Sequence, residues 1–434
     1  MNMAVYYYTG AAGGAWSTSG AWTLAGSAGT TGNPGVNDIA VLNNNGITIS
    51  NTTTGTIINV NKILGAYPLT GTITTTAGGG TLTGVGTAFL TELAIGSYIR
   101  NGTTGAIIGI VSSITSNTSA AITSGVAFSS ITGYAGGGAS ATVTLNITTN
   151  STYTISAPSG IEAGQILVNG PTLFIVQGAG NSSTTVTFNS ASGNIRGPGL
   201  SGGGNSAIKL NLTNSNIVIN ALNIYGGITS NDNNAIQNVG TGNTVTINAT
   251  GEVTGVIGPS VTQSAATGAI SIVTPIIKGG TGVPGFLMAV ANTSTQVISA
   301  TNITPSINCP AICVSNASTV GAVNTSKINI IGSINTTGNS ANPIAAIQAA
   351  NYYLNSSSIK LYNTTPSEVT YSTTVGTIPD PAYVLATVPV GSTVGTLTQA
   401  DPAAVLAGTS YGVISSVDPS PRTGTLNIGA AVWD

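Results

Sequence analysis

The stretch NSAIKLNLTNSNIVINALNIYG (Asn205–Gly226) decides the fold. Apolar residues alternate with small polar residues through most of it, which is the period of a half-buried β-strand. Ile and Thr favour a pleated surface, and Asn and Gly favour turns. One such unit cannot bury its inner face alone, whereas a stack of units can. We therefore expect this stretch to form one coil of a stacked array.

Units with similar openings recur along the chain: NNAIQNVG (Asn233–Gly240), TGAISIV (Thr267–Val273), CPAICVSN (Cys309–Asn316) and NPIAAIQA (Asn342–Ala349). Their spacing lies in the range of roughly 20–35 residues in which self-similarity indicates a solenoid. The sequence therefore predicts an all-β protein in which residues 136–365 form a parallel β-helix. The expected inward-facing core comprises Ile208, Leu210, Ile217, Ile219, Ile236, Val245, Ile247, Ile270, Ile272, Ile312, Val314, Ile328 and Ile330.

Two segments of this region are less regular. The loop GNIRGPGLSGGG (Gly193–Gly204) is expected to break the strand pattern, and NPIAAIQAANYYL (Asn342–Leu354) admits either a short helix or stacked strands. The strands expected before the regular coils are Thr142–Ile147, Thr152–Ile155, Gln165–Val168, Thr172–Val176 and Thr184–Phe188.

Charged residues are scarce. The 434 residues include 8 Lys and Arg, 10 Asp and Glu and no His, so that 4% are charged, against roughly a quarter in ordinary soluble domains. The net charge of −2 gives no electrostatic reason to bind nucleic acid or an acidic membrane. No run of about 18 apolar residues occurs, so we expect no membrane insertion. Solubility then depends on surface hydroxyls and amides, on obligate assembly, or on both.

Residues 1–66 are predicted to form an N-terminal capping and attachment segment. The open end of a solenoid exposes a core and a strand edge, and Trp16 and Trp22 are large enough to plug it. A stacking platform for sugar rings is the alternative role for these two rings. The spacing W-x5-W, a Gly-rich loop, then Pro34-x3-Asp38 and a β-strand resembles the opening of many tail-fibre and other appendage proteins of tailed bacteriophages.

Residues 67–135 are predicted to form a small β-barrel, because short strands alternate with Gly turns every eight to twelve residues or so. The run T-G-x-G-T-x-F-x3-L-x2-G-x2-I, from Thr83 to Ile99, resembles a small β-barrel module of phage structural proteins. Ser97 stands where an acidic residue is usual in that module, and we infer no lost activity from it. The core candidates are Leu82, Val85, Phe89, Leu93, Ile95, Tyr98, Ile99, Ile108, Ile110, Val111, Ile114, Ile122 and Phe128.

Residues 366–434 are predicted to form a Pro-rich extended tail or linker. Two related stretches, TVGTIPDPAYVLA (Thr374–Ala386) and TVGTLTQADPAAVLA (Thr393–Ala407), are too few for a solenoid. Pro-rich extended strands suit a linker or a strand-exchanging tail. The segment Ala407–Leu426 resembles spacer elements of phage fibre proteins, and Trp433 could anchor a neighbouring subunit.

The sequence offers little for chemistry, and we predict no enzyme activity and no catalytic, cofactor-binding or metal-binding residues. The commonest general base and metal ligand is absent, since the chain has no His. Cys309 and Cys313 would lie roughly 13 Å apart in a strand, too far for a disulfide, and are expected to be buried thiols. Gly280, Gly282 and Gly285 match G-x-G-x-x-G, but neither the following helix nor the acidic residue of a dinucleotide site is expected.

Asp232 and Glu252 form the best candidate for a catalytic pair. They are about one coil apart, and stacked coils are spaced by roughly 4.8 Å, close to the separation in a retaining glycosidase. A turn aspartate and an exposed glutamate explain both residues without chemistry. The N-x-[ST] sites, such as Asn146 and Asn211, are expected to reflect composition, and Asn residues at repeated turn positions can stack in amide ladders.

The resemblances imply a non-catalytic structural protein of a tailed-phage virion: a fibre, spike or capsid appendage that serves assembly and host-surface attachment. It would be a homotrimer made in the host cytoplasm, since no signal peptide is visible. Its partners would be capsid, neck, tail or baseplate proteins and a host surface polysaccharide. The alternatives are a β-helical tailspike that depolymerises polysaccharide, which needs an exposed carboxylate pair, and a bacterial surface adhesin, which needs a secretion signal.

Overall fold

A computed structural model describes most of the chain up to residue 304. It describes residues 3–304 except 28, 30–31, 44, 51–54, 124, 138–140, 148–149, 164–173, 178–183, 200–204, 229–232, 282 and 289–294. Beyond residue 304 it describes 311–314 and the backbone of short strands. The chain divides into two compact units, Met1–Ser372 and Thr373–Asp434. Among the described residues, the regular secondary structure is almost all strand, as the sequence predicts, and α1 (Phe89–Glu92) is a single helical turn.

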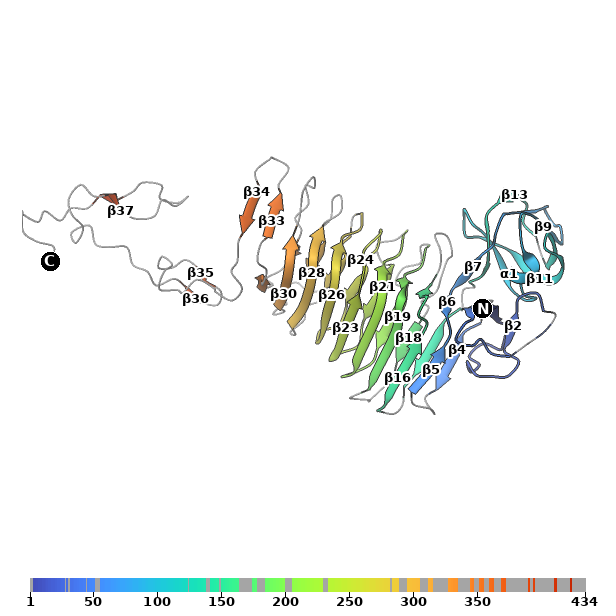
Figure 1. Ribbon diagram of the computed structural model, residues 1–434, viewed down its shortest axis with the longest axis horizontal. Coiled ribbons are helices and arrows are strands. Elements are labelled where there is room, and N and C mark those ends of the chain that lie inside the picture. Colours follow the sequence, from blue (N-terminus) through green and yellow to red (C-terminus); the bar gives the residue numbers. More distant parts are fainter. Residues whose placement is uncertain are drawn as a thin grey trace, which may run out of the picture. The chain divides into compact units, whose positions relative to one another are not determined.

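One long sheet of the first unit has nine strands, all paired in parallel (Figure 1). Its strands follow one another in space in the order in which they occur along the chain. They are β4 (Ile47–Ser50), β15 (Val143–Asn146), β18 (Phe174–Gln177), β20 (Ser206–Asn211), β22 (Asn234–Asn238), β25 (Val261–Gln263), β27 (Phe286–Met288), β29 (Ile312–Val314) and β31 (Ile344–Ala346).

The second long sheet has fifteen strands, and all its pairings are parallel except that of β1 with β2. Its strands alternate along the chain with those of the nine-stranded sheet, so each repeat crosses from one sheet to the other. They are β1 (Val5–Tyr8), β2 (Trp22–Leu24), β3 (Ile39–Val41), β5 (Gly55–Asn59), β6 (Lys62–Leu64), β16 (Thr152–Ser156), β17 (Gly160–Glu162), β19 (Thr185–Arg196), β21 (Asn216–Tyr225), β23 (Asn243–Ala249), β24 (Glu252–Thr254), β26 (Gly268–Lys278), β28 (Thr295–Thr304), β30 (Lys327–Ile334) and β32 (Asn351–Leu354).

The fifteen-stranded sheet is divided into two rows by a change of register. In β19 the register shifts between Ser190 and Asn194. Strand β21 shows the division most clearly, since Asn216–Ala221 pairs with β23 and its later part pairs with the separate strand β24. We call the row through β5, β16, β23 and the first parts of the long strands the first row. The row through β6, β17, β24 and the last parts of the long strands is the second row.

The prediction that Gly193–Gly204 breaks the pattern is wrong for its first four residues. Strand β19 continues to Arg196, because Asn194, Ile195 and Arg196 pair with β17 on one side and β21 on the other. Ile195 is fully buried. Gly193 permits the change of row, since a Cβ there would lie 2.0 Å from the Ser159 carbonyl carbon.

Apolar residues in register form the core between the sheets. Ile208 is paired with Ile236, and Ile217 with Val245, and all four side chains are fully buried. The prediction of the inward-facing core is confirmed for its nine described side chains, from Ile208 to Ile272. The side chains of Ile312, Val314, Ile328 and Ile330 lie outside the described residues, as does the expected strand Gln165–Val168.

The other strand predictions agree with the structure to within a few residues at their ends, as comparison with β15, β16, β18 and β19 shows. The sequence allowed either a helix or strands in the segment Asn342–Leu354. Its described residues form the strands β31 and β32. Tertiary stacking on the preceding coils accounts for this choice, because strand pairing overrides weak local propensity.

The third sheet is antiparallel and lies between β6 and β15 in the sequence. Its strand order is β13-β8-β9-β12-β11-β10-β14-β7. The strands are β7 (Ala66–Pro68), β8 (Thr72–Thr75), β9 (Thr81–Val85), β10 (Tyr98–Asn101), β11 (Ile107–Ser116), β12 (Ser119–Thr123), β13 (Phe128–Ile131) and β14 (Gly133–Gly136).

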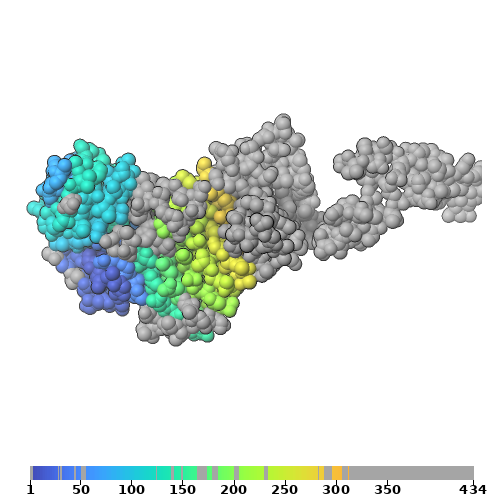
Figure 2. Space-filling model, turned by 180° about the vertical axis from the view of Figure 1, so that it is seen from behind, coloured from blue at the N-terminus to red at the C-terminus, as the bar shows by residue number. Residues whose placement is uncertain are grey.

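Most of the core expected for this segment is buried or half-buried, but Val85 is 75% exposed and was assigned wrongly. Val85 ends β9 opposite Thr72, where the alternation turns it outward. The core of the antiparallel sheet is shared with the N-terminal segment, since Tyr7, Val41 and Leu64 pack into it. In Figure 2 the antiparallel segment, in cyan, adjoins the N-terminal segment, in blue.

Strands β1, β3 and β6 are consequently buried on both faces. Tyr8, Ala40 and Ile63 point into the core between the long sheets, while their neighbours Tyr7, Val41 and Leu64 point into the core of the antiparallel sheet. Apart from Tyr6 and Lys62, which are only partly buried, these positions are apolar and covered on both sides, as in a sheet covered on two faces.

Aromatic residues close the N-terminal end of the main core. Trp22 is fully buried, with its ring centroid 4.7 Å from that of Trp16 and 5.2 Å from that of Tyr8. The indole N–H of Trp22 donates to the Trp16 carbonyl at 2.9 Å. Antiparallel β2 ends the sheet beside β1, so the parallel stack does not continue past it.

The second unit is described only in short antiparallel pairs. Strand β35 (Pro389–Val390) pairs with β36 (Thr393–Val394), and β37 (Ser410–Tyr411) pairs with β38 (Arg422–Thr423). Before it, β33 (Ile359–Tyr362) pairs with β34 (Glu368–Tyr371) in the first unit. No helix in the described part of the chain is long and apolar enough to cross a membrane.

Candidate functional site

The charged side chains of the coils are concentrated on the outer side of the second row. Glu162 of β17 lies in register with Arg196 of β19, and Arg196 with Tyr225 of β21. The register continues to Thr254 of β24 and Lys278 of β26. The residues before them, Ile161, Ile195, Ile224, Val253 and Ile277, are fully buried, so the charged and polar members point away from the core.

Two further charged residues belong to the same surface. Lys62 of β6 reaches Glu162 from the neighbouring strand, and Glu252 lies two residues before Thr254 on the same side of β24. We call Lys62, Glu162, Arg196, Tyr225, Glu252, Thr254 and Lys278 the charged row. It holds five of the 8 basic and 10 acidic residues of the chain.

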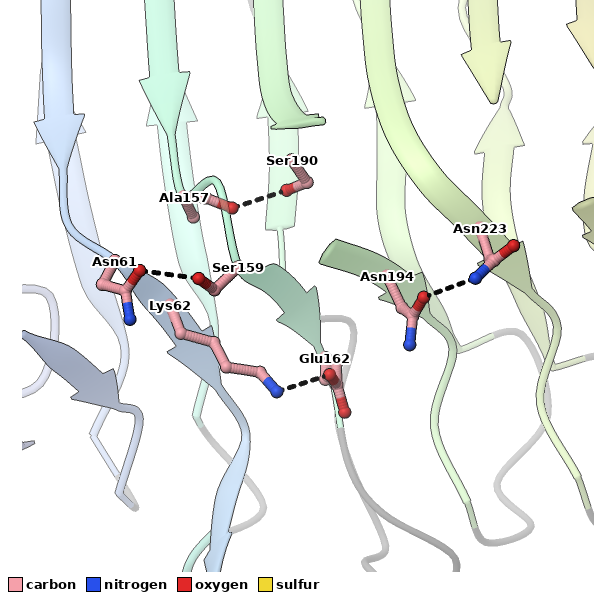
Figure 3. A network of polar contacts seen from close by, with 8 residues as sticks. All are labelled: Asn61, Lys62, Ala157, Ser159, Glu162, Ser190, Asn194 and Asn223. Carbon is pink, nitrogen blue, oxygen red and sulfur yellow. Dashed lines mark hydrogen bonds and ion pairs between the residues drawn. The ribbon is translucent and has the colours of Figure 1, made fainter. Parts of the chain in front are cut away.

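An ion pair joins the first two coils of the charged row. The Lys62 Nζ lies 2.7 Å from the Glu162 Oε1, and the side chains are 25% and 8% exposed. Figure 3 shows this pair beside the hydrogen bond from the Ser159 hydroxyl to the Asn61 side-chain oxygen, at 2.6 Å. Leu64, on the same side of β6 as Lys62, is covered by the antiparallel sheet. The charged row therefore begins where that cover ends.

The centre of the charged row is a three-residue contact. The Arg196 guanidinium carbon lies 4.3 Å from the centroid of the Tyr225 ring, a cation–π distance. The Tyr225 hydroxyl is hydrogen-bonded to Glu252. Partial burial raises the pKa of Tyr225, and the hydrogen bond to Glu252 and its charge raise it further, while Arg196 opposes them. The positive and negative groups of this row thus neutralise one another across neighbouring coils.

Amide ladders run between the coils, but not at the turn positions where the sequence predicts them. The Asn223 amide donates to the Asn194 side-chain oxygen at 3.0 Å (Figure 3), and the Glu252 N–H donates to the Asn223 side-chain oxygen at 2.9 Å. In the first row, the Asn248 amide donates to Asn220 at 3.0 Å. These residues lie within paired strands rather than in turns, and each bond joins two successive coils.

The outer side of the first row, unlike that of the second row, carries small uncharged side chains. In-register ranks such as Thr154, Thr187, Val218, Thr246 and Ser271 carry no charge and no aromatic ring. We call this surface the uncharged face. It consists of Thr152, Thr154, Ser156, Thr185, Thr187, Asn189, Asn216, Val218, Asn220, Thr244, Thr246, Asn248, Ala269, Ser271 and Val273.

The proposed carboxylate pair of Asp232 and Glu252 stays a prediction, because only Glu252 is among the described residues. Asp232 lies outside the described residues, and Glu252 is engaged with Tyr225. The other carboxylate of the charged row, Glu162, is three strand spacings from Glu252 through β19 and β21, or about 14 Å. Glycosidase carboxylates are separated by roughly 5–9.5 Å. Among the described side chains, no group of three or more His, Cys, Asp and Glu could hold a metal ion.

Gly280 and Gly285 of the glycine motif lie in the connection between β26 and β27, and Gly282 lies outside the described residues. Gly280 forms an isolated bridge with Val283, and β27 follows in place of a helix. Cys309 and the side chain of Cys313 lie outside the described residues. The N-x-[ST] residues Asn146 and Asn211 lie at the ends of β15 and β20, and the Gln177 amide donates to Asn146 at 2.7 Å.

Buried amides between the two sheets were missed by the sequence patterns. Asn238, Asn243 and Gln263 are fully buried. The Asn238 amide donates to Gln263 at 2.7 Å, and the Asn243 amide donates to Asn238 at 3.0 Å. The Gln263 amide in turn donates to the Gly268 carbonyl at 2.8 Å. The first bond joins two adjacent coils, and the other two join the nine-stranded and fifteen-stranded sheets within one coil, so this cluster has a structural role.

The antiparallel segment holds two buried ionisable residues. The Glu92 carboxylate accepts the Thr70 N–H at 3.1 Å, and the Arg100 guanidinium donates to the Gly105 carbonyl at 2.7 Å. Burial lowers the pKa of Arg100. Ser97, the departure from the usual acidic residue, is buried and its hydroxyl donates to the Ala94 carbonyl at 2.7 Å. Both ionisable groups bond to backbone of the same segment, although the buried Arg100 Nε has no hydrogen-bond partner among the described residues, and these contacts indicate a role in folding.

The charged row was also missed, although a signal for it exists in the sequence. GIEAG (Gly160–Gly164), NIRGPG (Asn194–Gly199), NIYGG (Asn223–Gly227), EVTGV (Glu252–Val256) and IIKGG (Ile276–Gly280) share an apolar residue, then a polar or charged one, then small residues. Aligning the units on these endings, and not on their openings, places the charged row in one line. Comparison of the chain with protein-family models, curated proteins and solved structures finds no match.

Proposed function

We propose that the chain is a non-catalytic structural protein of a tailed-phage virion: a fibre, spike or capsid appendage whose parallel sheets form a β-helix. The observation that carries the proposal is the continuous parallel register of both long sheets. From β4 to β31 and from β3 to β32, each strand adds to the previous coil. Such stacking suits a stiff spacer or display surface, because each coil needs only its neighbours.

The charge distribution supports a structural role. The charged row joins neighbouring coils through Lys62–Glu162 and Arg196–Tyr225–Glu252, so these groups stabilise the stack and leave few charges free for a substrate. A depolymerase would need two carboxylates at catalytic separation, and the spacing of Glu162 and Glu252 argues against that pair.

The positions of the two hydrophobic cores suggest which segments of the chain have which role. The N-terminal segment and the antiparallel sheet, which we propose is the small β-barrel, share one core. We propose that residues 1–135 and the tail from residue 366 contact other virion proteins, and that the chain assembles as a homotrimer in the virion. Attachment to a host surface polysaccharide would then use hydroxyls, amides and aromatic rings, which salt screens little.

Two in-frame deletions test the proposal in particles from infected cells, with mass spectrometry of gradient-purified virions as the readout. Deleting the coils between Asn205 and Asn342 is expected to leave the protein in particles and shorten the appendage. Deleting residues 1–66 is expected to abolish its incorporation. Loss of the protein in the first case and its retention in the second would contradict the proposal. Absence of the full-length chain from purified particles would refute a virion role altogether.

A further inference from the structure

We infer that a group of buried amides sets the register in which the coils of the stack pair. The group consists of Asn238, Asn243, Gln263 and Gln296, which we call the buried amides, and all four side chains are fully buried. The inference concerns how this sequence selects one arrangement of its coils, and it does not depend on the virion role.

The buried amides link successive coils through hydrogen bonds. The Asn243 side-chain oxygen accepts the Ser215 N–H at 3.0 Å, and its amide donates to the Leu212 carbonyl at 2.9 Å. Both bonds tie Asn243 to the coil before its own. The Asn243 amide also donates to Asn238, and the Asn238 amide donates to Gln263 in the coil that follows.

The series of bonds continues into a fourth coil. The amides of Gln263 and Gln296 both donate to the Gly268 carbonyl, at 2.8 and 3.1 Å. The Gln296 side-chain oxygen accepts the Ile270 N–H at 2.7 Å. Buried hydrogen bonds therefore run without a break from the coil of β20 and β21 to the coil of β27 and β28.

Three of the buried amides point into the core from positions that suit apolar residues. Asn238 is in register with Leu210 of the preceding coil and with Gln263 of the following one. Gln296 lies two residues before the fully buried Ile298, and therefore on the same inward side of β28. Burial alone does not explain amides at these positions, because an apolar side chain would fill the same space without needing a partner.

The apolar ranks of the core do not define a unique register. A shift of one residue would turn every inward side chain outward, but a shift of two restores the alternation. Ile217 lies opposite Val245, and a shift of two would bring it opposite Ile247, which is apolar and buried as well. The stack also accommodates changes of register, since one occurs in β19 between Ser190 and Asn194.

The buried amides remove this ambiguity. A shift of two residues between β22 and β25 would place Asn238 opposite Val261, or Gln263 opposite Ile236. The amide would then lose its partner within the core, and a buried amide without a partner costs more than a hydrogen bond gains. A single buried Asn sets the register of coiled coils in the same way.

One hydroxyl acts in the same sense between the same two coils. The Thr262 hydroxyl donates to the Asn234 side-chain oxygen at 2.5 Å, and both side chains are buried. A shift of two residues would separate this pair as well, so the test removes it together with the amides.

The test replaces the buried polar contacts between these two coils by apolar side chains. The apolar variant carries Asn238→Leu and Gln263→Met, which continue the series of Leu210 and Met288 at the same register positions. It also carries Thr262→Val.

The matched control alters the core between the same coils but removes no polar contact. It carries Ile247→Leu and Ile272→Met, at two buried positions that lie opposite each other in β23 and β26. Any effect of repacking alone appears in this control.

Pairs of cysteines on the outer side of β23 and β26 report the register. Thr246 lies opposite Ser271, between Ala269 and Val273. Cα atoms in register are about 4.8 Å apart, whereas an offset of two residues gives about 8 Å, beyond the reach of a disulfide. Thr246→Cys with Ser271→Cys reports the parental register, and Thr246→Cys with Ala269→Cys or Val273→Cys reports a shift. Both natural cysteines are replaced by Ser throughout, and peptide mass spectrometry measures each cross-linked fraction.

We expect the shifted pairs to cross-link at least about tenfold more in the apolar variant than in the parent, with unchanged far-ultraviolet circular dichroism. The control is expected to keep the parental register. Amides that only stabilised the stack would give a lower melting temperature with the parental register kept. That result would overturn the inference, as would an equal rise of shifted cross-links in the control. If the apolar variant loses its β-structure, the same cross-linking measured on Gln263→Met alone decides by the same criterion.

Discussion

The first and second rows of the long sheet differ although the same strands build both. Along β21, Ile217 and Ile219 in the first row and Ile224 in the second are buried alike. On the outer side, Val218 and Asn220 give way to Asn223 and Tyr225 within a few residues. The inner sides are interchangeable because they serve one core. The outer sides are specialised, which shows that stacking leaves each outward surface free to take its own chemistry.

The largest expected effect distinguishes the inner from the outer side of one strand. Ile247 is fully buried, and Ile247→Asp is expected to prevent folding. The substitution loses the burial of an apolar side chain, which contributes about 1.5–3 kcal/mol. It also buries a carboxylate without a partner, which costs further free energy. Its neighbour Thr246 faces outward, so Thr246→Asp is expected to leave the monomer folded. Circular dichroism and thermal melting of both variants give the answer, and equal melting of Ile247→Asp and the parent would show that the inward assignment is wrong.

The next effect distinguishes the charged row from the uncharged face. Glu162→Gln is expected to lower the free energy of unfolding by about 1–3 kcal/mol, because Glu162 is nearly buried beside Lys62. Thr187→Val on the uncharged face is expected to change it by less than about 0.5 kcal/mol. Urea denaturation measures the free energy of unfolding of both variants. An equal loss of stability in Thr187→Val and Glu162→Gln would contradict the claim that the charged row stabilises the stack more than the uncharged face does.

The amide ladders offer a finer comparison between the rows. Asn223 bonds to both Asn194 and the Glu252 N–H, whereas Asn248 makes one ladder bond, to Asn220. At about 1 kcal/mol for each hydrogen bond, Asn223→Ala should cost about twice as much as Asn248→Ala. The same denaturation experiment compares them, with Asn189→Ala as a reference in the first row. A larger loss from Asn248→Ala would mean that the ladders do not contribute as the bond count indicates.

The smallest expected effect concerns alkaline pH. Burial raises the pKa of Tyr7 well above its ordinary value of 10.0, and nearby Tyr67 and Glu92 raise it further. Above pH of about 10 the unfolded state loses this proton while the folded state keeps it, so stability falls as pH rises. Tyr7→Phe should make that fall less steep. Denaturation of both proteins between neutral and strongly alkaline pH measures the slopes, and identical slopes would exclude Tyr7 as a source.

Period-two alternation was sufficient to predict the inward-facing core from the sequence, and the recurrence of similar units to predict that the strands stack in parallel. Ile208, Ile217 and Val245 could be assigned inward without a structure because a wrong register would have exposed every apolar residue of the strand. Val85 was assigned wrongly because its apolar character was given more weight than the alternation, which places it on the side opposite to buried Leu82. The strand that ends at Arg196 was missed because Gly193 and Gly197 flank it, and glycine weakens a strand pattern even where the backbone is paired.

The outer surfaces were harder to predict than the core. The charged row joins residues from separate units, and only the register places Glu162 beside Arg196 and Arg196 beside Tyr225. The core that the antiparallel sheet shares with the N-terminal segment could not be predicted either. The alternation of β1 does not indicate that the antiparallel sheet covers Tyr7. Contacts between distant segments depend on topology, which local patterns do not contain.

Deletion of one whole coil tests the central claim, a stack of interchangeable coils, most directly. Asn216 lies in register with Thr244, as Asn220 does with Asn248 at a separation of 28 residues. Joining Ser215 to Thr244 therefore removes one repeat and keeps every remaining pair in register. Amide hydrogen exchange in this variant is predicted to show Val186–Phe188 and Ile270–Ile272 protected as in the parent. Loss of protection in both segments would contradict a stack of coils.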